Sequence, residues 1–497
     1  MTATFPGIAR NIGCHRNEID LGGLGEQMAM KQRVVDYIVG HLAAIGVDYI
    51  FGVDGTNIED LYDAAFFQSD ITAVLAKHEF SAATMADGYS RSGSGLGVVA
   101  ATSGGGALNL VPGLGESFAS RVPVLALVGQ PATTMDGRGS FEDTSGRNGS
   151  LNAEALFSEV SVFCRRVQTP ADIASALPAA VAAARTGGPA VLLLPKDVQQ
   201  SDVRVNGCIG EHGVERPGNI GDPRPIVRAL RRVTGPVTII AGEQVARDDA
   251  RAELASVRAV LRARVACVPH AKDAAGAPAF DGPGVRYRDA MSVLDRVLPD
   301  GVDIVVDVGS TGAAAVHYLP VRRGGRFAVA LGMGYSFGAG IGMAFSRAKA
   351  RTPGGRVVVI AGDGAFFMHG MEVHTAVHYR LPVTFVLFNN NAHAMGVIRE
   401  QLFYGDRHSY NRFAPSRLGA GLAAMLPGLP SVDVNDADGF SAAMRTALDV
   451  DGPSVVSIAC AADEIPPFAT FLEPSVAKNL VCQDITQENR TDVVLSV

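Results

Sequence analysis

The chain has 497 residues, 47% of them apolar and 19% charged, so it is long enough for two or three globular domains with buried cores. Its net charge is −7 and it has no long basic run, which argues against nucleic acid as a partner. No apolar segment approaches the length needed to cross a bilayer, so no membrane partner is expected.

Residues 1–30 lack the basic and then apolar pattern of a secretory signal, and we expect them to form a loosely ordered extension. The six cysteines are scattered and include no CxxC pair. This spacing is typical of neither a disulfide scaffold nor a zinc site. The sequence therefore predicts a cytoplasmic protein with reduced thiols.

Strand and helix signals alternate between residues 31 and 198, which predicts a parallel sheet covered by helices on both faces. The expected strands are residues 49–53, 73–76, 97–102, 122–128 and 190–194. Glu79 begins a helix directly after the second of these, at the sheet edge where ligands bind. A favourable interaction with the helix dipole would also explain a glutamate there. Residues 102–109 (TSGGGALN) form a glycine-rich turn after the next strand.

The middle segment, residues 199–302, is short for a complete α/β domain, since each βα unit takes about 30 residues. Its patterns predict a helix at 225–233, a strand at 237–241, a helix at 249–262 and a strand at 265–268. We interpret it as a truncated middle domain.

The last α/β unit, residues 303–470, contains a strand–helix–strand pattern between two β-branched runs, residues 357–360 and 383–388. The first run ends in Gly362-Asp363-Gly364 and the second in Asn389-Asn390-Asn391. Because the carboxyl ends of parallel strands lie at one sheet edge, Asp363 and the asparagines are expected to meet. A carboxylate, an amide oxygen and a backbone carbonyl suit Mg²⁺.

The interval of 24 residues between Gly364 and Asn389 resembles the cofactor motif of thiamine-diphosphate (ThDP) enzymes. Together with Glu79 and the glycine-rich turn, it makes the chain similar to the acetolactate (acetohydroxyacid) synthases over most of residues 31–200 and 300–415. The resemblance implies two doubly wound parallel-sheet α/β domains, a pyrimidine-binding one (31–198) and a diphosphate-binding one (303–470). They would flank the truncated middle domain and precede a C-terminal tail (471–497).

The resemblance also implies roles for single residues. Glu79 would be the acid beside the cofactor's aminopyrimidine, with a pKa raised by a water-poor site. Asp363 and Asn390 would bind Mg²⁺ by side chain and Ala392 by its carbonyl. Further cofactor-binding positions would be Ser310, Thr311, Met333, Gly362, Gly364, Ala365 and Met395. The alternatives are that Ser310 and Thr311 simply cap a helix and that Met333 fills the core.

The substrate side departs from the synthases. Arg399 stands where they carry a tryptophan, and it would either clamp an anionic acceptor or be a solvated helix residue. Gly105 replaces their usual proline, and Gly55 is assigned with it to the substrate side. His393, directly after the metal loop, is the candidate for proton transfer near substrate.

The resemblance implies an enzyme that decarboxylates a pyruvate-like 2-oxoacid and transfers the acyl carbanion to a second carbonyl compound. The alternatives are a simple 2-oxoacid decarboxylase and a non-catalytic protein of the same fold. FAD is not expected, because the synthases bind it partly in the domain that is truncated here. A homodimer or homotetramer with active sites at subunit interfaces is expected.

Overall fold

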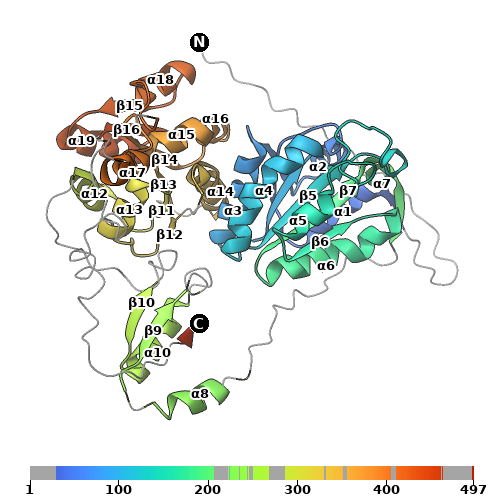
Figure 1. Cartoon of the computed structure of the whole chain (residues 1–497), viewed down its shortest axis with the longest axis horizontal. Coiled ribbons are helices and arrows are strands. Elements are labelled where there is room, and N and C mark those ends of the chain that lie inside the picture. Colours follow the sequence, from blue (N-terminus) through green and yellow to red (C-terminus); the bar gives the residue numbers. More distant parts are fainter. Residues whose placement is uncertain are drawn as a thin grey trace, which may run out of the picture.

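The computed structural model describes residues 30–93, 95–205, 222, 224–233, 235–242, 245, 250–267, 286–329, 332–350, 355–404, 410–460, 462 and 495–496. Within them, two six-stranded parallel sheets, each with helices packed on it, are joined by a smaller α/β segment (Figure 1). The predicted α/β class with two doubly wound sheets is confirmed. The expected extension and tail lie outside the described residues, except for Met30 and β17 (Leu495–Ser496).

The first sheet has the strand order β3-β2-β4-β5-β7-β6, and all its pairs are parallel. Its strands are β2 (Tyr49–Gly52), β3 (Thr72–Leu75), β4 (Gly97–Ala101), β5 (Val124–Gln130), β6 (Phe163–Arg166) and β7 (Pro189–Pro195). Its helices are α1 (Val34–Ala44), α2 (Glu59–Phe66), α3 (Glu79–Arg91), α4 (Gly104–Ala119), α5 (Ala153–Ser158), α6 (Ile173–Arg185) and α7 (Lys196–Gln200). The antiparallel pair β1 (Met30–Arg33) and β8 (Asp202–Val205) ties the two ends of this unit together.

Alternate residues of the central strands face opposite layers of core, as the period of two requires. In β4, Val98 packs into the layer that contains α1 and α6, whereas Val99 packs into the layer that contains α3 and α4. Both residues are fully buried. Because both faces are covered, these strands read as continuous apolar runs in the sequence.

The second sheet has the strand order β12-β11-β13-β14-β16-β15 and is also parallel. Its strands are β11 (Asp303–Val306), β12 (Phe327–Val329), β13 (Val357–Gly362), β14 (Val383–Asn389), β15 (Ser431–Val434) and β16 (Ser454–Ala459). Its helices are α12 (Arg286–Val297), α13 (Ser310–Tyr318), α14 (Tyr335–Ala350), α15 (Asp363–His369), α16 (Val373–His378), α17 (Ala394–Tyr404), α18 (Leu418–Met425) and α19 (Ala437–Leu448), with the short 3-10 turn η4 (Gly370–Glu372) before α16.

The middle segment contains the four elements that its sequence predicts. They are α8 (Arg224–Leu230), β9 (Thr238–Ala241), α10 (Arg251–Leu261) and β10 (Arg264–Cys267). Strands β9 and β10 pair in parallel, and β17 adds to β9 from the other end of the chain. No helix among the described residues is both long and apolar enough to span a membrane.

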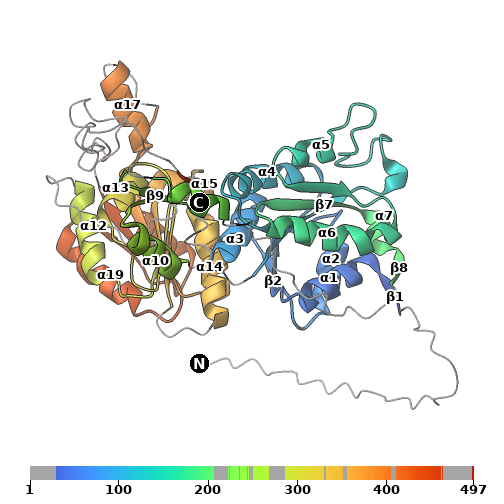
Figure 2. The same ribbon diagram turned by 90° about the horizontal axis from the view of Figure 1, so that it is seen from below.

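The two α/β domains meet through α3 and α14, which lie side by side between the sheets (Figure 1 and Figure 2). The backbones approach closely at glycines. A Cβ atom added to Gly88 would lie 2.1 Å from the carbonyl oxygen of Ala339, and one added to Gly342 would lie 2.0 Å from that of Met85. Glycine is therefore required at both positions by the distance between the helices rather than by their dihedral angles.

Candidate active site

Glu79 is the first residue of α3, directly after the loop that leaves β3. The preceding His78 is the N-cap, and its Nδ1 accepts a hydrogen bond from the amide of Phe80 at 3.1 Å. His78 therefore has a structural role in starting the helix. The Glu79 carboxylate is half-buried and accepts a hydrogen bond from Nδ2 of Asn109 at 2.9 Å.

The glycine-rich turn at the start of α4 packs against Glu79. A Cβ atom on Gly106 would lie 2.8 Å from Cγ2 of Thr102 and 3.2 Å from Oε1 of Glu79, whereas one on Gly105 would meet nothing within 4 Å. Gly55 also contacts Thr102, since a Cβ atom added to Gly55 would lie 2.8 Å from the Cβ atom of Thr102. The three residues predicted in the first domain, Gly55, Glu79 and Gly105, thus gather at the carboxyl edge of its sheet.

The adjacent glycines Gly105 and Gly106 make a matched pair for mutagenesis. We expect Gly105→Ala to raise the free energy of unfolding by about 0.4–1 kcal/mol, because the new methyl group has room and the unfolded chain loses freedom. Gly106→Ala should instead lower it by about 1–3 kcal/mol, because the methyl group collides with Thr102 and displaces Glu79. Urea unfolding of both variants measures the difference, and equal effects would contradict the packing described here.

A cavity of about 340 Å³ lies at the carboxyl edge of the second sheet. Every residue that the sequence assigns to this domain's cofactor, metal and proton-transfer sites lines it: Ser310, Thr311, Met333, Gly362, Asp363, Gly364, Ala365, Asn390, Ala392, His393 and Met395. Its volume is in the range of small-molecule sites. Of the residues predicted in the second domain, only Arg399 is not on its wall.

Oxygen donors converge at one end of the cavity. Asp363 is 1% exposed, and its Oδ2 accepts the amide of Ala392 at 3.2 Å, while Oδ1 of Asn390 accepts the same amide at 3.0 Å. Burial raises the pKa of Asp363 to about 6, although backbone hydrogen bonds from Gly364 and Ala392 oppose the rise. A nearby cation stabilises the ionised form of such a buried carboxyl group, and hard oxygen donors suit Mg²⁺.

The three consecutive asparagines have different tasks. Asn389 donates to the carbonyl of Ser416 at 2.8 Å, and Asn391, at φ 53°, accepts the amide of Ser416 at 2.8 Å. Both hold the loop that follows the strand. Asn390 alone turns its side-chain oxygen toward the amide of Ala392 beside Asp363. The middle asparagine is therefore the one available to a metal.

Ser310 and Thr311 form the first turn of α13 and are each 4% exposed. The N-cap of this helix is Gly309, at φ 120°, and no side chain caps it. Capping therefore does not explain these hydroxyl groups. Among the described residues, Oγ of Ser310 is buried without a hydrogen-bond partner. A phosphate oxygen at this helix start would satisfy it.

Met333 is presented to the cavity by a turn that a buried aspartate fixes. Asp307 follows β11, and its carboxylate accepts the amides of Gly334 and Ser336, each at 2.9 Å. Burial raises the pKa of Asp307 to about 6, against the effect of these hydrogen bonds. Met333 remains 37% exposed, so it is not core filling.

His393 and Arg399 lie differently. The His393 ring packs against Gly364, where an added Cβ atom would come within 2.5 Å of Nδ1, and its centroid is 4.7 Å from that of Phe413. It therefore lines the cavity and contacts Gly364, the residue that follows Asp363. Arg399 is exposed on α17 and does not line the cavity.

Glu79 is not on the wall of this cavity within the single chain. The helix that it begins nevertheless contacts the second domain through His369 at the end of α15. Phe80 stacks on His369 with ring centroids 4.3 Å apart, and the Lys77 amide donates to Glu372 at 2.7 Å. Burial, and then the neighbouring His78, lower the pKa of His369 to about 4, so the imidazole ring that stacks on Phe80 is neutral at neutral pH.

Two residues that hold or border the site, Asp307 and Asn411, are not among those predicted from the sequence. Asp307 orients the Met333 turn, and Asn411 borders the cavity and donates to Glu400 at 2.7 Å. The position of Asp307 at the end of an apolar strand could have identified it. Asn411 lies in a loop, and no periodic pattern in its surroundings marks it.

The family model described as "Thiamine pyrophosphate enzyme, N-terminal TPP binding domain" matches residues 32–149, and the corresponding C-terminal TPP binding domain matches residues 307–458. A probable acetolactate synthase large subunit of Methanocaldococcus jannaschii is 26% identical over 75% of this chain and 82% of its own. Another, from Methanococcus aeolicus, is 23% identical over 91% of this chain and 96% of its own.

Two solved structures are similar in fold. Benzoylformate decarboxylase from Polynucleobacter necessarius has a TM-score of 0.75 and 19% identity, and covers 88% of this chain with all of its own. A putative thiamin diphosphate-dependent enzyme from Mycobacterium smegmatis has a TM-score of 0.72 and 18% identity, over 87% of this chain and all of its own. At these identities the likeness concerns the fold alone.

Proposed function

The chain belongs to the thiamine pyrophosphate enzymes, in the acetolactate synthase-like family, and from this we propose that it is a ThDP- and Mg²⁺-dependent carboligase. It would decarboxylate a pyruvate-like 2-oxoacid and join the resulting acyl carbanion equivalent to a second carbonyl compound. The observation that carries the proposal is that one chain holds both a carboxyl group at the glycine-rich turn of its first domain and a cavity of oxygen donors and glycines in its second domain.

The residues present fit the cofactor. Asp363, Asn390 and the Ala392 carbonyl would hold Mg²⁺, and the unpartnered hydroxyl of Ser310 would bind the diphosphate. Met333 would contact the cofactor from its turn. When bound, ThDP supplies the electron sink that lets carbon dioxide leave. Glu79 would hold the proton that the aminopyrimidine needs, and His393 would move protons at the substrate end.

The same site is also compatible with two alternative functions. A simple decarboxylase would use a proton as the acceptor, and a structural neighbour with that activity has the same fold. A non-catalytic relative would bind cofactor without turnover. The presence of Glu79, Asp363 and Asn390 together favours an enzyme over the second alternative.

Product analysis separates these functions. We expect the full chain with ThDP, Mg²⁺ and pyruvate to release carbon dioxide, and to form a ligation product when an aldehyde or a second 2-oxoacid is added. Release without any ligation product would favour the decarboxylase. Cofactor binding without release from pyruvate, 2-oxobutyrate or benzoylformate would favour the non-catalytic protein. A pure protein without yellow absorbance would support the expected absence of FAD.

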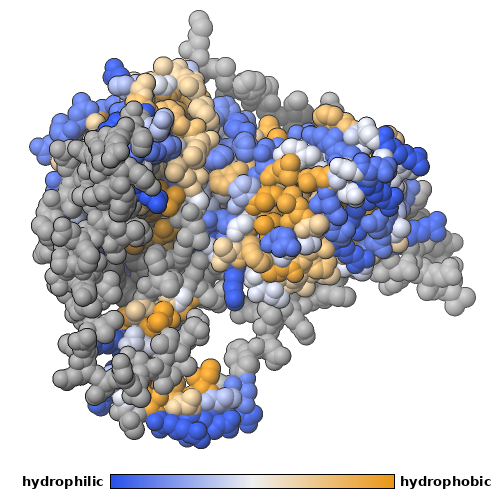
Figure 3. Space-filling view, in the orientation of Figure 1, coloured by the Kyte–Doolittle hydropathy of each residue, from blue (hydrophilic) through white to orange (hydrophobic). Residues whose placement is uncertain are grey.

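We further propose a homodimer or homotetramer in the cytoplasm. Because Glu79 does not border its own chain's cavity, a second copy that brought its Glu79 there would complete the site. The first domain also exposes apolar side chains over α4 and α5 (Figure 3), with Leu108 43% and Phe118 42% exposed on α4. Such a surface fits an interface between subunits. Light scattering on the purified chain measures the assembly.

A further inference from the structure

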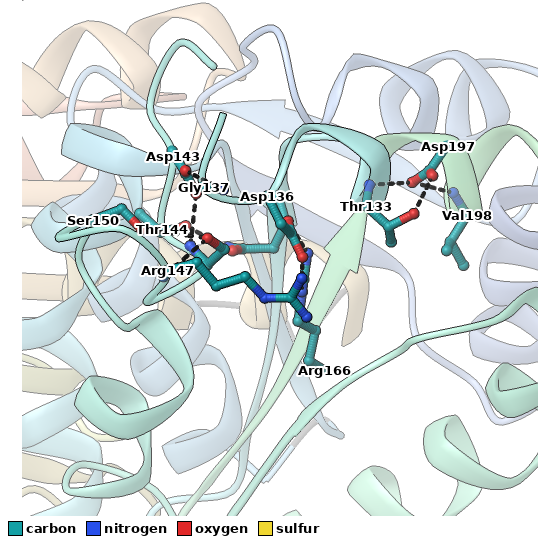
Figure 4. A network of polar contacts seen from close by, with 12 residues as sticks. Thr133, Asp136, Gly137, Asp143, Thr144, Arg147, Ser150, Arg166, Asp197 and Val198 are labelled. Carbon is teal, nitrogen blue, oxygen red and sulfur yellow. Dashed lines mark hydrogen bonds and ion pairs between the residues drawn. The ribbon is translucent and has the colours of Figure 1, made fainter. Parts of the chain in front are cut away.

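The loop between β5 and α5 carries Glu142. A network of polar contacts holds this loop in place (Figure 4). Asp143 accepts the amides of Gly137 and Ser145 at 2.8 and 2.9 Å, and Thr144 donates to Gln130 at 2.6 Å. The residues on the C-terminal side of Glu142 are thus tied to the sheet, which fixes the position of its backbone.

The remaining anchors hold the loop at its base. Arg166 makes a two-pronged ion pair with Asp136 at 2.7 and 2.8 Å, and Thr133 donates to Asp197 (Figure 4). Burial alone would raise the pKa of Asp143, but hydrogen bonds from Ser145, Gly137 and Ser150 outweigh it and lower that pKa. Asp143 therefore stays ionised as an acceptor, and the loop keeps its shape.

Glu142 has a backbone conformation that residues other than glycine rarely adopt, with φ 58°. Its side chain is turned toward the glycine-rich turn. A Cβ atom on Gly104 would lie 2.7 Å from both Cβ and Cγ of Glu142, and Oγ of Ser103 donates to Oε2 of Glu142 at 3.4 Å. A strained residue that is held by a rigid loop and aimed at a site is a reason to look for a function.

Glu79 and Glu142 therefore contact the same turn, Glu79 at Gly106 and Glu142 at Gly104. Burial raises the pKa of Glu142, the Ser103 hydroxyl opposes this rise, and the negative charge of Glu79 adds to it. Glu142 makes no ion pair among the described residues, and the exposed Arg399 does not reach the cavity. Two carboxyl groups thus meet at this turn, and no cationic side chain among the described residues forms an ion pair with either.

We propose that Glu142 is a specificity-determining residue of the active site, and that its carboxylate disfavours acceptors that carry a carboxylate of their own. The acceptor class would then be an uncharged carbonyl compound, such as an aldehyde, rather than a second 2-oxoacid. This inference rests on the proposed carboligase function. Like charges that approach in a partly dehydrated site repel each other more strongly than they do in water.

Both kinds of acceptor undergo the same balanced step. A carbon–carbon bond forms at the acceptor's carbonyl carbon, the electron pair of the carbon–oxygen double bond moves to oxygen, and that oxygen takes up a proton. Propanal and 2-oxobutyrate share this chemistry and differ by one carboxylate. Any effect of Glu142 on the donor cancels in the ratio of the two products.

The test is a competition between these two acceptors. The full chain with ThDP, Mg²⁺ and isotopically labelled pyruvate is given equal concentrations of propanal and 2-oxobutyrate, and labelled products are quantified per carbon dioxide released. We expect the wild type to favour the aldehyde. Glu142→Gln should raise the share of the carboxylate-bearing product about tenfold, which corresponds to about 1.4 kcal/mol of electrostatic free energy. Glu142→Gly, which suits φ 58°, should shift it in the same direction.

Two further measurements make the outcome decisive. Glu159→Gln, at an exposed position after α5, removes the same charge away from the turn and should leave the product ratio unchanged. The affinity of each variant for ThDP with Mg²⁺ reports whether the site is intact. An unchanged ratio in both Glu142 variants, with carbon dioxide still released, would overturn this inference and leave the carboligase proposal standing. Absence of ThDP-dependent release from the wild type with pyruvate, 2-oxobutyrate or benzoylformate would overturn both.

Discussion

Replacing Glu79 by glutamine is expected to lower ThDP-dependent release of carbon dioxide by at least about 100-fold, the usual contribution of a positioned acid or base. Glutamine keeps the shape of the side chain and still offers Asn109 an oxygen acceptor. It has no proton to give at neutral pH. The loss should therefore fall on turnover and not on the fold.

Binding measurements distinguish this role from a structural one. The affinity of Glu79→Gln for Mg²⁺ and for inorganic diphosphate should match that of the wild type, because Asp363, Asn390 and Ser310 lie in the other domain. Glu159→Gln is the matched control and should keep full activity. Retained turnover in Glu79→Gln would remove the assignment of the acid, and lost diphosphate binding would show that Glu79 holds the fold.

The sequence predicts most of the second domain's site because its chemistry sits at strand ends. Asp363 and Asn390 each follow a long buried strand, and parallel pairing of β13 with β14 brings both to one edge. The repeat of β-branched residues defines the two strands, so the meeting of their ends follows from topology alone. The same reasoning locates Glu79 after β3.

The sequence does not predict features that depend on loops and on tertiary packing. Strand β6 is missing from the predicted elements, because its FCRR segment includes two charged residues and lies at the edge of the sheet. Glu142 owes its direction to a positive φ angle and to hydrogen bonds made by its neighbours. The choice among three asparagines depends on Ser416, which is 25 residues further along the chain from Asn391. None of these follows from a local pattern.

The sequence also does not predict the contact between the two domains. Glycines in α3 and α14 permit close packing, but they do not identify the partner helix. In the structure Asp87 is fully buried. Its carboxylate accepts from Arg91 at 2.5 Å, from Ser117 at 2.7 Å and from the hydroxyl of Tyr335 in the other domain. One carboxylate thus joins α3, α4 and α14.

Replacing Asp87 by alanine is expected to lower the free energy of unfolding by about 3–5 kcal/mol, the usual cost of removing one partner of a buried ion pair. The Arg91 guanidinium, whose carbon atom lies 5.6 Å from the Tyr335 ring centroid, would keep its charge in a buried site without this carboxylate. Burial raises the pKa of Tyr335, so its hydroxyl remains a neutral donor that also loses its acceptor. Urea unfolding, followed by circular dichroism, measures the change.

A surface ion pair supplies the comparison. Asp36 pairs with Arg33 at 2.8 Å, but the two side chains are 37% and 34% exposed, so Asp36→Ala should cost no more than about 1 kcal/mol. Tyr335→Phe removes only the hydroxyl donor and should fall between the two variants. Since Asp87 lies on the helix that begins at Glu79, a weakened contact at Asp87 should also lower turnover more than it lowers diphosphate affinity. If Asp87→Ala costs no more than Asp36→Ala, the two domains do not depend on this carboxylate for their contact.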